Sequence, residues 1–208
     1  MQTIRYYTTK SINDLFKDSM SRIASQAMIL TAGVPKLDTS PILHGSTLSS
    51  VCSLSVYPNP LLQFNLHLPS YTSSTLHDNG LVAIHVMKPT AKGSNIGRIF
   101  AKGVKRNDGK IISKGENKDG EIFHEMTTPF QSIDKKDWEF HEVGNFRLPI
   151  LNDSERIFIC EKNKVFNVEN HEIWIVKVVD IISKSTIKTG GLLYFNRRFH
   201  HIGHSINE

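Results

Sequence analysis

Residues 62–68, LQFNLHL, alternate between apolar and polar side chains. Leu62, Phe64, Leu66 and Leu68 occupy every second position, which is the period of a β-strand with one buried face. Further apolar segments of strand length are predicted at 28–30, 42–50, 81–87, 156–162, 164–168, 172–182 and 190–195. Many short strands and only two or three helices predict a mainly β domain, built as a barrel.

Three segments are predicted to be helical. Residues 11–27 carry apolar side chains three or four positions apart, and Ser11 can cap that helix. The apolar positions are Ile12, Leu15, Phe16, Met20, Ile23 and Ala27. A short helix over 72–79 is expected to stop at Gly80, because glycine takes the left-handed conformation that often ends helices. The third helix, over 90–101, contains two glycines.

The composition is that of an ordinary globular protein. Of the 208 residues, 39% are hydrophobic and 22% are charged, and we expect one domain over 11–208. No apolar run approaches the roughly 20 residues of a membrane-spanning helix, so we expect no membrane association. The net charge of +5 favours anionic partners, either phosphate-bearing ligands or nucleic acid.

The charged segment 102–120 is predicted to be a surface loop or hairpin. Its basic residues alternate with glycine, asparagine and aspartate. This mixture is typical of a solvated loop, so we do not expect nucleic acid to bind there.

Two features bear on the cell compartment. Cys52 and Cys160 lie far apart in apolar segments, which indicates reduced, buried thiols and a reducing compartment. Residues 1–10 contain basic and hydroxyl residues and no acid, which is the composition of a short transit peptide. We therefore expect import into the mitochondrial matrix. The alternative is a frayed tail on a cytoplasmic protein.

Six hydroxyl side chains crowd into the segment 46–55. They are Ser46, Thr47, Ser49, Ser50, Ser53 and Ser55. They belong either to a solvated loop or to a cradle of short donors for a polar ligand.

Several motifs in a fixed order bear on that choice. They are GSTLSSVCSLSVYPNPLLQFNLHLPSYTSSTLHDNGLVAIHVM at 45–87, GRIFA at 97–101, FICEKNKVFNVENHEIWIVKVVDI at 158–181 and GGLLYFNRRFHHIG at 190–203. Together they resemble the flavin reductase-like, FMN-binding split-barrel family. The likeness covers residues 20–203 apart from the charged loop.

The resemblance implies a split β-barrel of Greek-key type, a homodimer, and a flavin near the subunit interface. The flavin would be FMN, with FAD as the alternative. Carried over by resemblance, Thr47, Ser49 and Ser50 contact the flavin ring and ribityl chain, while Ser70 and Thr72 bind the phosphate. The phosphate assignment has a physical reason of its own, because both residues open a predicted helix whose N-terminal amides attract anions. On the plainer interpretation the serines at 49 and 50 face solvent, and the one at 70 only caps the helix.

The phosphate turn departs from the family pattern. Tyr71 stands where many members have an arginine, so a phosphate charge partner is either missing or supplied from elsewhere, for instance by Lys102 or Arg98. The usual Asp-Pro-Pro is replaced by Tyr57-Pro58-Asn59-Pro60, which puts the geometry of that loop in doubt.

The family's Gly-Asp-His turn is present here as Glu169-Asn170-His171. The resemblance implies that His171 lies near the nicotinamide of NADH or NADPH. A neutral imidazole could hydrogen-bond the carboxamide and hold the nicotinamide over the flavin for hydride transfer. The alternative is a structural histidine at the start of a strand.

These residues leave three functions open. The first is an NAD(P)H:flavin oxidoreductase, which keeps its reduced flavin or passes it to an electron-acceptor partner. The second is a non-catalytic flavin-binding or assembly protein, favoured by the changed residues Glu169 and Asn170. The third is a basic module that docks on RNA or a ribonucleoprotein through 102–114. No metal site is expected: His200 and His204 would share one face of a helix, but no cysteine lies nearby, and we expect a solvated tail there.

Overall fold

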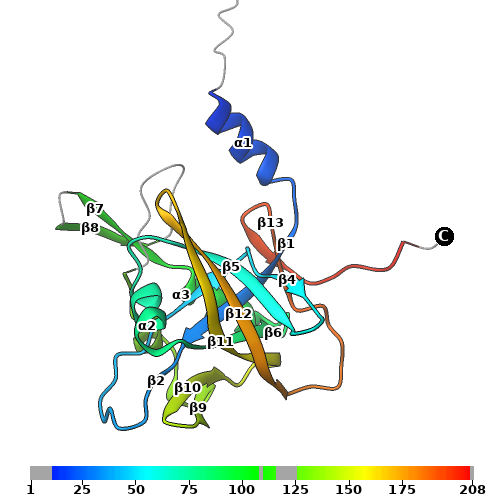
Figure 1. Cartoon of the computed structure of the whole chain (residues 1–208). Helices are drawn as coiled ribbons and strands as arrows, with labels where there is room; N and C mark the ends of the chain where they lie inside the picture. Colours follow the sequence, from blue (N-terminus) through cyan, green and yellow to red (C-terminus); the bar gives the residue numbers. More distant parts are fainter. Residues whose placement is uncertain (1–10, 108–109, 116–125, 207–208) are drawn as a thin grey trace, which may run out of the picture.

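The computed structural model describes residues 11–107, 110–115 and 126–206. It is mainly β with three α-helices among these residues, as predicted (Figure 1). The predicted transit peptide, 1–10, lies outside the described residues and stays a prediction. No helix in the described ranges is long and apolar enough to cross a membrane.

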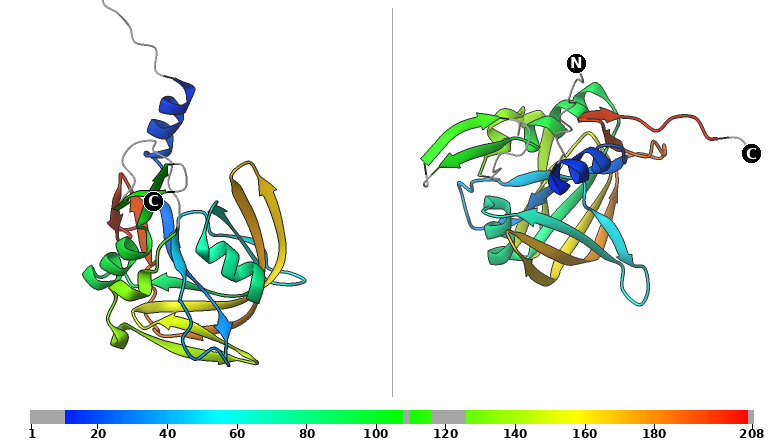
Figure 2. Two further views of the ribbon diagram at one scale, coloured as in Figure 1. Left: turned by 90° about the vertical axis from the view of Figure 1, so that its left-hand side faces the viewer. Right: turned by 90° about the horizontal axis from the view of Figure 1, so that it is seen from above.

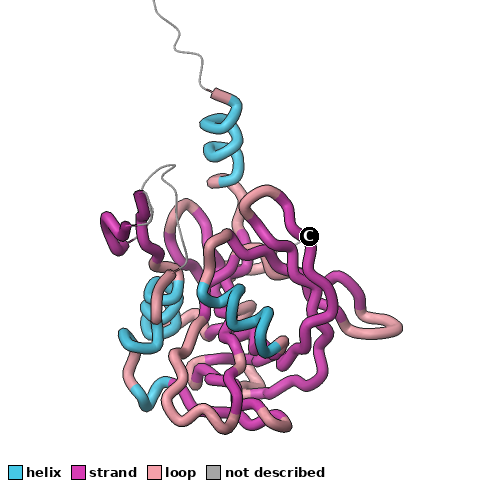
Figure 3. The backbone as a smooth tube through the Cα atoms, turned by 60° about the vertical axis from the view of Figure 1, so that its left-hand side comes forward, coloured by secondary structure: helices cyan, strands magenta, loops and turns pink. Residues whose placement is uncertain are grey.

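One large antiparallel sheet forms the barrel. Its strand order is β14-β13-β1-β6-β11-β12-β5-β4, and β3 pairs with β1 beside that path. The bounds are β1 Ser25–Ala32, β3 Gly45–Leu48, β4 Cys52–Ser55, β5 Leu61–His67, β6 Leu81–Met87, β11 Ser154–Val168, β12 His171–Ser183, β13 Leu192–Phe195 and β14 Arg198–His200. Because β3 and β4 are joined by a short connection, the sheet must curl to bring them together. The result is the expected split barrel (Figure 3).

Two smaller sheets flank the barrel. One has the order β2-β10-β9, with β2 Val34–Pro35, β9 Trp138–Val143 and β10 Phe146–Leu151. The other is a hairpin of β7 Gly103–Asn107 and β8 Lys110–Gly115. The two strands lie within the first part of the charged segment 102–120, which was predicted to be a surface loop or hairpin. The remainder of that segment, 116–120, lies outside the described residues.

The first helix is shorter than predicted. Helix α1 spans Ile12–Met20, and the Ser11 hydroxyl caps it by accepting a hydrogen bond from the Asp14 amide at 3.1 Å. The prediction that it extends to residue 27 was wrong, because Ala27 belongs to β1, where it is buried and lies opposite Leu192 of β13. Strand pairing and burial therefore decided this boundary. None of the residues of α1 is buried, and Figure 2 shows the helix standing away from the barrel.

The other two helices match their predictions closely. Helix α2 spans Tyr71–Asn79 and ends at Gly80, whose φ of 67° is the left-handed conformation expected there. Helix α3 spans Ala91–Phe100. Its glycines have a packing reason, because a Cβ at Gly97 would lie 3.0 Å from the ring of Phe199, and a Cβ at Gly93 would lie 2.3 Å from a backbone oxygen.

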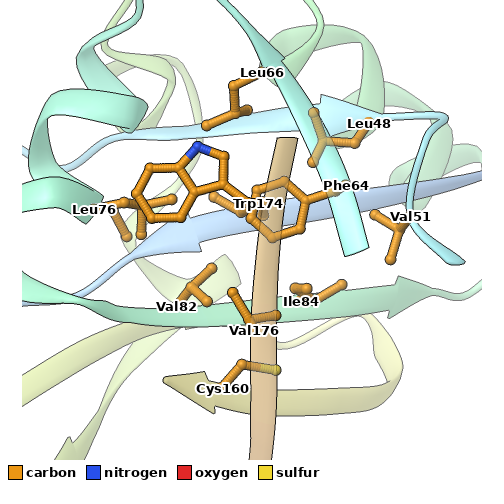
Figure 4. Packing of buried hydrophobic residues seen from close by; sticks show 12 residues of the cluster. Leu48, Val51, Phe64, Leu66, Leu76, Val82, Ile84, Cys160, Trp174 and Val176 are labelled. Atoms are coloured by element: carbon orange, nitrogen blue, oxygen red, sulfur yellow. The ribbon is translucent and has the colours of Figure 1, made fainter. Parts of the chain in front are cut away.

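The barrel interior holds two of the largest fully buried side chains. Trp174 of β12 and Phe64 of β5 lie parallel, with ring centroids 6.3 Å apart, and Leu76 of α2 packs in the same cluster (Figure 4). Truncating a buried tryptophan to alanine costs about 3–5 kcal/mol. A second cluster fills the space between the outer face of β1 and α3. Strand β12 is therefore anchored from inside the barrel.

The two cysteines have different environments. Cys160 lies in the barrel interior, and burial raises the pKa of its thiol to about 12. Cys52 is exposed, so the prediction that both thiols are buried was wrong for this residue. It lies on β4, at the end of the sheet, where most side chains have no covering layer. Both cysteines are free thiols.

Candidate functional site

A pocket of about 360 Å³ opens on the outer face of the barrel, where β5 and β12 meet the connection between β3 and β4. Its lining includes Ser50, Asn65, Val168, Glu169, His171 and Ile173. The pocket brings together Ser50, predicted to contact the flavin, and His171, predicted to position the nicotinamide. These two residues are more than a hundred positions apart in the chain.

Strand alternation explains why these side chains face outward. In β12, Glu172 and Trp174 point into the barrel and are buried, so His171 and Ile173 point to the other face. The Cα register pairs His171 with His67 of β5, and Ile173 with Asn65. Residues directly opposite in an antiparallel pair share a face. The polar side chains of β5 therefore lie beside the outward side chains of β12.

His171 belongs to a small hydrogen-bonded group. Its Nδ1 lies 2.9 Å from the Oδ1 of Asn170, and the Nδ2 of Asn170 lies 2.9 Å from the Nε2 of His67. The two imidazole rings are 4.9 Å apart and nearly perpendicular. His67 was not among the predicted site residues, and Asn170 was considered only as a departure from the family pattern. The signal for His67 was its place on the polar face of the alternating strand 62–68.

The turn between β11 and β12 holds this group in place. Val168 pairs with His171, so Glu169 and Asn170 form a two-residue hairpin loop. Glu169 has φ of 50°, a conformation that favours glycine. The backbone amide of Leu68 donates to the carbonyl of Asn170 at 2.8 Å. This bond ties the hairpin loop to the chain just before the predicted phosphate turn.

The three hydroxyls predicted to contact the flavin do different things. Ser50 lines the pocket, and its Oγ accepts a hydrogen bond from the Asn65 amide at 3.1 Å. Thr47 donates to the carbonyl of Gly97 at 2.8 Å and so holds α3 against β3. Ser49 is exposed and lines a separate hollow between α1 and the β13–β14 hairpin. The structure therefore places only one of the three, at position 50, in the pocket with the histidine.

The predicted phosphate turn is the N-terminus of α2. Ser70 caps the helix, because its Oγ accepts a hydrogen bond from the Ser73 amide at 3.0 Å. The side chains of Ser70 and Thr72 are both buried. The plainer interpretation of Ser70 as a cap is thus confirmed, and its phosphate role stays a prediction that depends on the amides of the first helical turn.

The side chains beside this turn include two rings. His44 lies 5.1 Å from Tyr71 between ring centroids. Burial lowers the pKa of His44, although a hydrogen bond to the carbonyl of Thr127 opposes that effect. His44 is therefore a neutral neighbour at pH 7, not a replacement for the family's arginine.

The proposed charge partners of the phosphate lie on or after α3. The Thr127 hydroxyl donates to the carbonyl of Lys102 at 3.3 Å, and the Thr127 carbonyl lies 3.4 Å from Nδ1 of His44. Lys102 takes part in this chain of contacts only through its carbonyl, so the contacts place its backbone, and not its ammonium group, near His44. Arg98 is exposed in the last turn of α3.

A buried carboxylate connects α2 to β12. Glu172 accepts hydrogen bonds from Ser73 Oγ, from His77 Nε2 at 2.9 Å and from Trp174 Nε1 at 3.0 Å. Burial raises the pKa of Glu172, but the three hydrogen bonds outweigh burial, so its pKa is lowered overall. The carboxylate is thus charged at neutral pH and fixes the helix that carries the phosphate turn.

Metal ligands do not gather in this region. Within the described ranges, no three or more histidine, cysteine, aspartate or glutamate side chains are grouped to hold a metal ion. His200 Nε2 lies 3.1 Å from the carbonyl of Phe195, a contact within its own hairpin.

Comparison with known proteins identifies the family. The family model described as the flavin reductase like domain matches residues 20–203. The chain belongs to the flavin reductase-like family. Its general chemistry is therefore flavin reduction, and the protein is an oxidoreductase.

Solved structures agree with this flavin reductase-like fold. A flavin reductase domain protein from Arthrobacter sp. FB24 has a TM-score of 0.67 at 20% identity, over 95% of this chain and 99% of that one. The NADH:FAD oxidoreductase SgcE6 from Streptomyces globisporus C-1027 has a TM-score of 0.67 at 15% identity, over 100% of this chain and 98% of that one. The flavin reductase HpaC complexed with NADP+ has a TM-score of 0.63 at 18% identity, over 92% and 98%. At these identities the likeness establishes the fold alone.

Proposed function

We propose that this flavin reductase-like protein binds FMN and transfers to it a hydride from NADH or NADPH. The observation that carries the proposal is the single pocket lined by both Ser50 and His171. When bound, the flavin supplies the hydride-accepting chemistry, and the protein supplies binding and orientation.

The residues around the pocket fit a flavin. A flavin ring is planar and largely apolar with a polar edge, and Val168 and Ile173 offer apolar surface beside the polar groups of Ser50 and Asn65. An FMN phosphate needs several donors, and the N-terminus of α2 offers backbone amides. The bond from Leu68 to Asn170 keeps these two regions adjacent. FAD is the alternative flavin.

The proposed role of His171 is positioning. Its half-buried imidazole lines the pocket and is held by Asn170. A ring nitrogen that hydrogen-bonds the nicotinamide carboxamide restricts where the nicotinamide lies, which lowers the entropic part of the barrier. No protein side chain has to act as a nucleophile in this reaction.

A second candidate function is flavin binding without turnover. The observation that favours it is Glu169, which adopts the left-handed φ of 50° at the position where the family has glycine. A loop that has lost this glycine has a changed surface at the pocket. The third interpretation, docking on RNA through 102–114, depends on basic side chains of a segment in which the structure describes only the backbone of 104–107 and 110–114.

A spectrum of the purified protein tests these alternatives. We expect flavin absorbance after addition of FMN and removal of the excess, and bleaching of that absorbance when NADH or NADPH is added without oxygen. Bound flavin that neither nucleotide reduces would favour the non-catalytic candidate. Failure to bind any flavin would contradict both candidates.

We also propose a homodimer, with α1 at or near the interface. Among the described residues, α1 has no buried side chain, yet it exposes Ile12, Phe16 and Met20. Sedimentation velocity should give the mass of two chains. A mass of one chain at micromolar concentration would exclude the dimer. The proposed reaction includes the transfer of reduced flavin to an electron-acceptor partner as an alternative to keeping it bound.

The mitochondrial matrix is the proposed location. If residues 1–10 are a transit peptide, protein isolated from cells should begin near Thr8 to Ser11, which leaves α1 whole. Cytosolic protein that retains Met1 would contradict this location and favour the cytoplasmic alternative.

A further inference from the structure

Asn170 lies between two imidazoles, those of His67 and His171, which the register of β5 and β12 places opposite each other. Its side-chain amide nitrogen is 2.9 Å from His67 Nε2, and its amide oxygen is 2.9 Å from His171 Nδ1. Its own backbone carbonyl accepts a hydrogen bond from the Leu68 amide at 2.8 Å. Three contacts therefore fix the residue, two to the end of β5 and one to the start of β12.

The two ends of the amide are chemically different, and this difference determines the protons on both rings. An amide nitrogen only donates, so His67 must offer an unprotonated Nε2 to Asn170. An amide oxygen only accepts, so His171 must carry a proton on Nδ1. In the neutral ring the other nitrogen, Nε2 of His171, then holds a lone pair. This nitrogen is the one farther from the backbone.

We propose that Asn170 is a positioning residue, which fixes His171 in the Nδ1–H tautomer so that its Nε2 accepts a hydrogen bond from the nicotinamide carboxamide. This inference rests on the proposed function, because it assumes that the nicotinamide lies in the pocket with His171. It adds two residues, Asn170 and His67, to the site and assigns each ring nitrogen a role.

The charges around the group make the choice of asparagine matter. Glu169 of the same loop lines the pocket, while Glu172 points into the barrel toward its own three donors. The facing side chains of β5, Gln63 and Asn65, are neutral. An aspartate at position 170 would accept from both rings and stabilise their protonated forms. Asparagine allows only neutral His67 to complete the group.

The test combines NMR of the ring nitrogens with kinetics on the full-length protein. Two-bond proton–nitrogen spectra of uniformly labelled wild type should show the Nδ1–H tautomer for both His67 and His171 near neutral pH. Single His→Gln variants assign the signals. This measurement needs no activity, so it stands even if the wild type fails to reduce flavin, an outcome that would defeat the proposed function alone.

The variants connect the tautomer to turnover. Asn170→Ala should let His171 adopt the Nε2–H tautomer and slow anaerobic flavin reduction by about 10-fold, a typical loss of substrate positioning. Asn170→Asp keeps the acceptor for His171 Nδ1, so it should recover most of the rate at high pH. Its rate should fall on acidification at a higher pH than that of the wild type. Asn163→Ala, an exposed position in the same hairpin, is the control and should behave as wild type.

Two results would overturn the inference. One is a wild-type spectrum in which His171 carries its proton on Nε2, because the amide would then be reversed. The other is Asn170→Ala with unchanged tautomers or an unchanged rate of flavin reduction. If that variant fails to fold, the wild-type spectrum and Asn170→Asp still decide the question.

Discussion

The inner and outer faces of β12 differ in burial and in the partners of their side chains. On the inner face, Glu172 and Trp174 are buried, and the Glu172 carboxylate accepts hydrogen bonds from Ser73 Oγ and Trp174 Nε1. On the outer face, His171 and Ile173 line a pocket and are only partly covered. The inner face of β12 thus holds α2, which begins at the predicted phosphate turn. The outer face offers the proposed contact with the nicotinamide.

The difference shows how a barrel can separate stability from recognition. A buried carboxylate is tolerated only when hydrogen bonds replace its water, and the three donors to Glu172 do so. A side chain that must meet a ligand has to keep a group available on the open face. Changes on the inner face should therefore alter folding, and changes on the outer face should alter turnover.

The largest effect is expected from Glu172→Ala. The substitution leaves the donors of Ser73, His77 and Trp174 without their acceptor inside the protein, at a cost of about 3 kcal/mol or more in the free energy of unfolding. Urea denaturation at pH 7 measures it. Glu172→Gln, which keeps one acceptor, should lower the free energy of unfolding by less. His171→Ala is the matched change on the outer face, and an equal loss of stability in that variant would show that the two faces do not differ in their contribution to folding.

His85 shows that a side chain on the outer face of the sheet can also be buried when other elements cover it. It lies on β6 and is fully buried, with its Nδ1 2.8 Å from the carbonyl of Ile29. Burial lowers its pKa to about 4, although that hydrogen bond opposes the effect. The neutral form is therefore the one that the folded protein prefers.

This shift predicts a loss of stability in acid. Because the folded pKa is below the unfolded value, the stabilisation is complete above about pH 6.5 and is lost as the pH falls toward 4, by about 3 kcal/mol in total. His85→Gln cannot titrate, so its stability difference between pH 7 and pH 4 should be smaller by that amount. The same pH dependence in both proteins would show that another group is responsible.

The next effect concerns the phosphate turn. Ser70→Ala with Thr72→Ala should weaken FMN binding by tens-fold or more, because hydrogen bonds to charged groups contribute about 1.5–3 kcal/mol each. The affinity for riboflavin, which lacks the phosphate, should change little. Fluorescence titration with both ligands measures the difference. Thr90→Ala, which removes the cap of α3, controls for the loss of a helix cap. Equal losses for the two ligands would remove both residues from the phosphate site.

The smallest effect is expected at the hairpin loop. Glu169→Gly relieves the left-handed backbone but adds chain entropy to the unfolded state, so we expect a gain of only about 0.5 kcal/mol. Thermal unfolding detects it. Glu169→Ala keeps a Cβ and should bring no gain. A loss of stability in the glycine variant would show that the glutamate side chain supports the loop.

Much of the fold could be predicted from the sequence. Alternation in 62–68 identified β5, Gly80 ended α2 where expected, and the order of motifs identified the split barrel. The boundary of α1 could not be predicted, because Ala27 fits a helical spacing and a strand equally well, and only pairing with Leu192 decides between them. Cys52 was misjudged for a similar reason, since nothing local shows that β4 ends the sheet.

The site was predictable where one residue carries its own signal. His171 stood out through its motif, and the structure places it with Ser50 in one pocket. His67 and Asn170 could not be found in that way, because their contact depends on the register between β5 and β12, which joins residues about a hundred positions apart. The inward network of Glu172 escaped notice for the same reason.

Stopped-flow reduction of bound flavin in His171→Ala shows whether the outer face of β12 positions the nicotinamide. We expect retained flavin, an unchanged melting temperature, and a rate of flavin reduction that is lower by about 10- to 100-fold. His171→Asn, which keeps a hydrogen-bonding amide, should recover part of that rate. An unchanged rate in His171→Ala, or a variant that unfolds, would contradict the account.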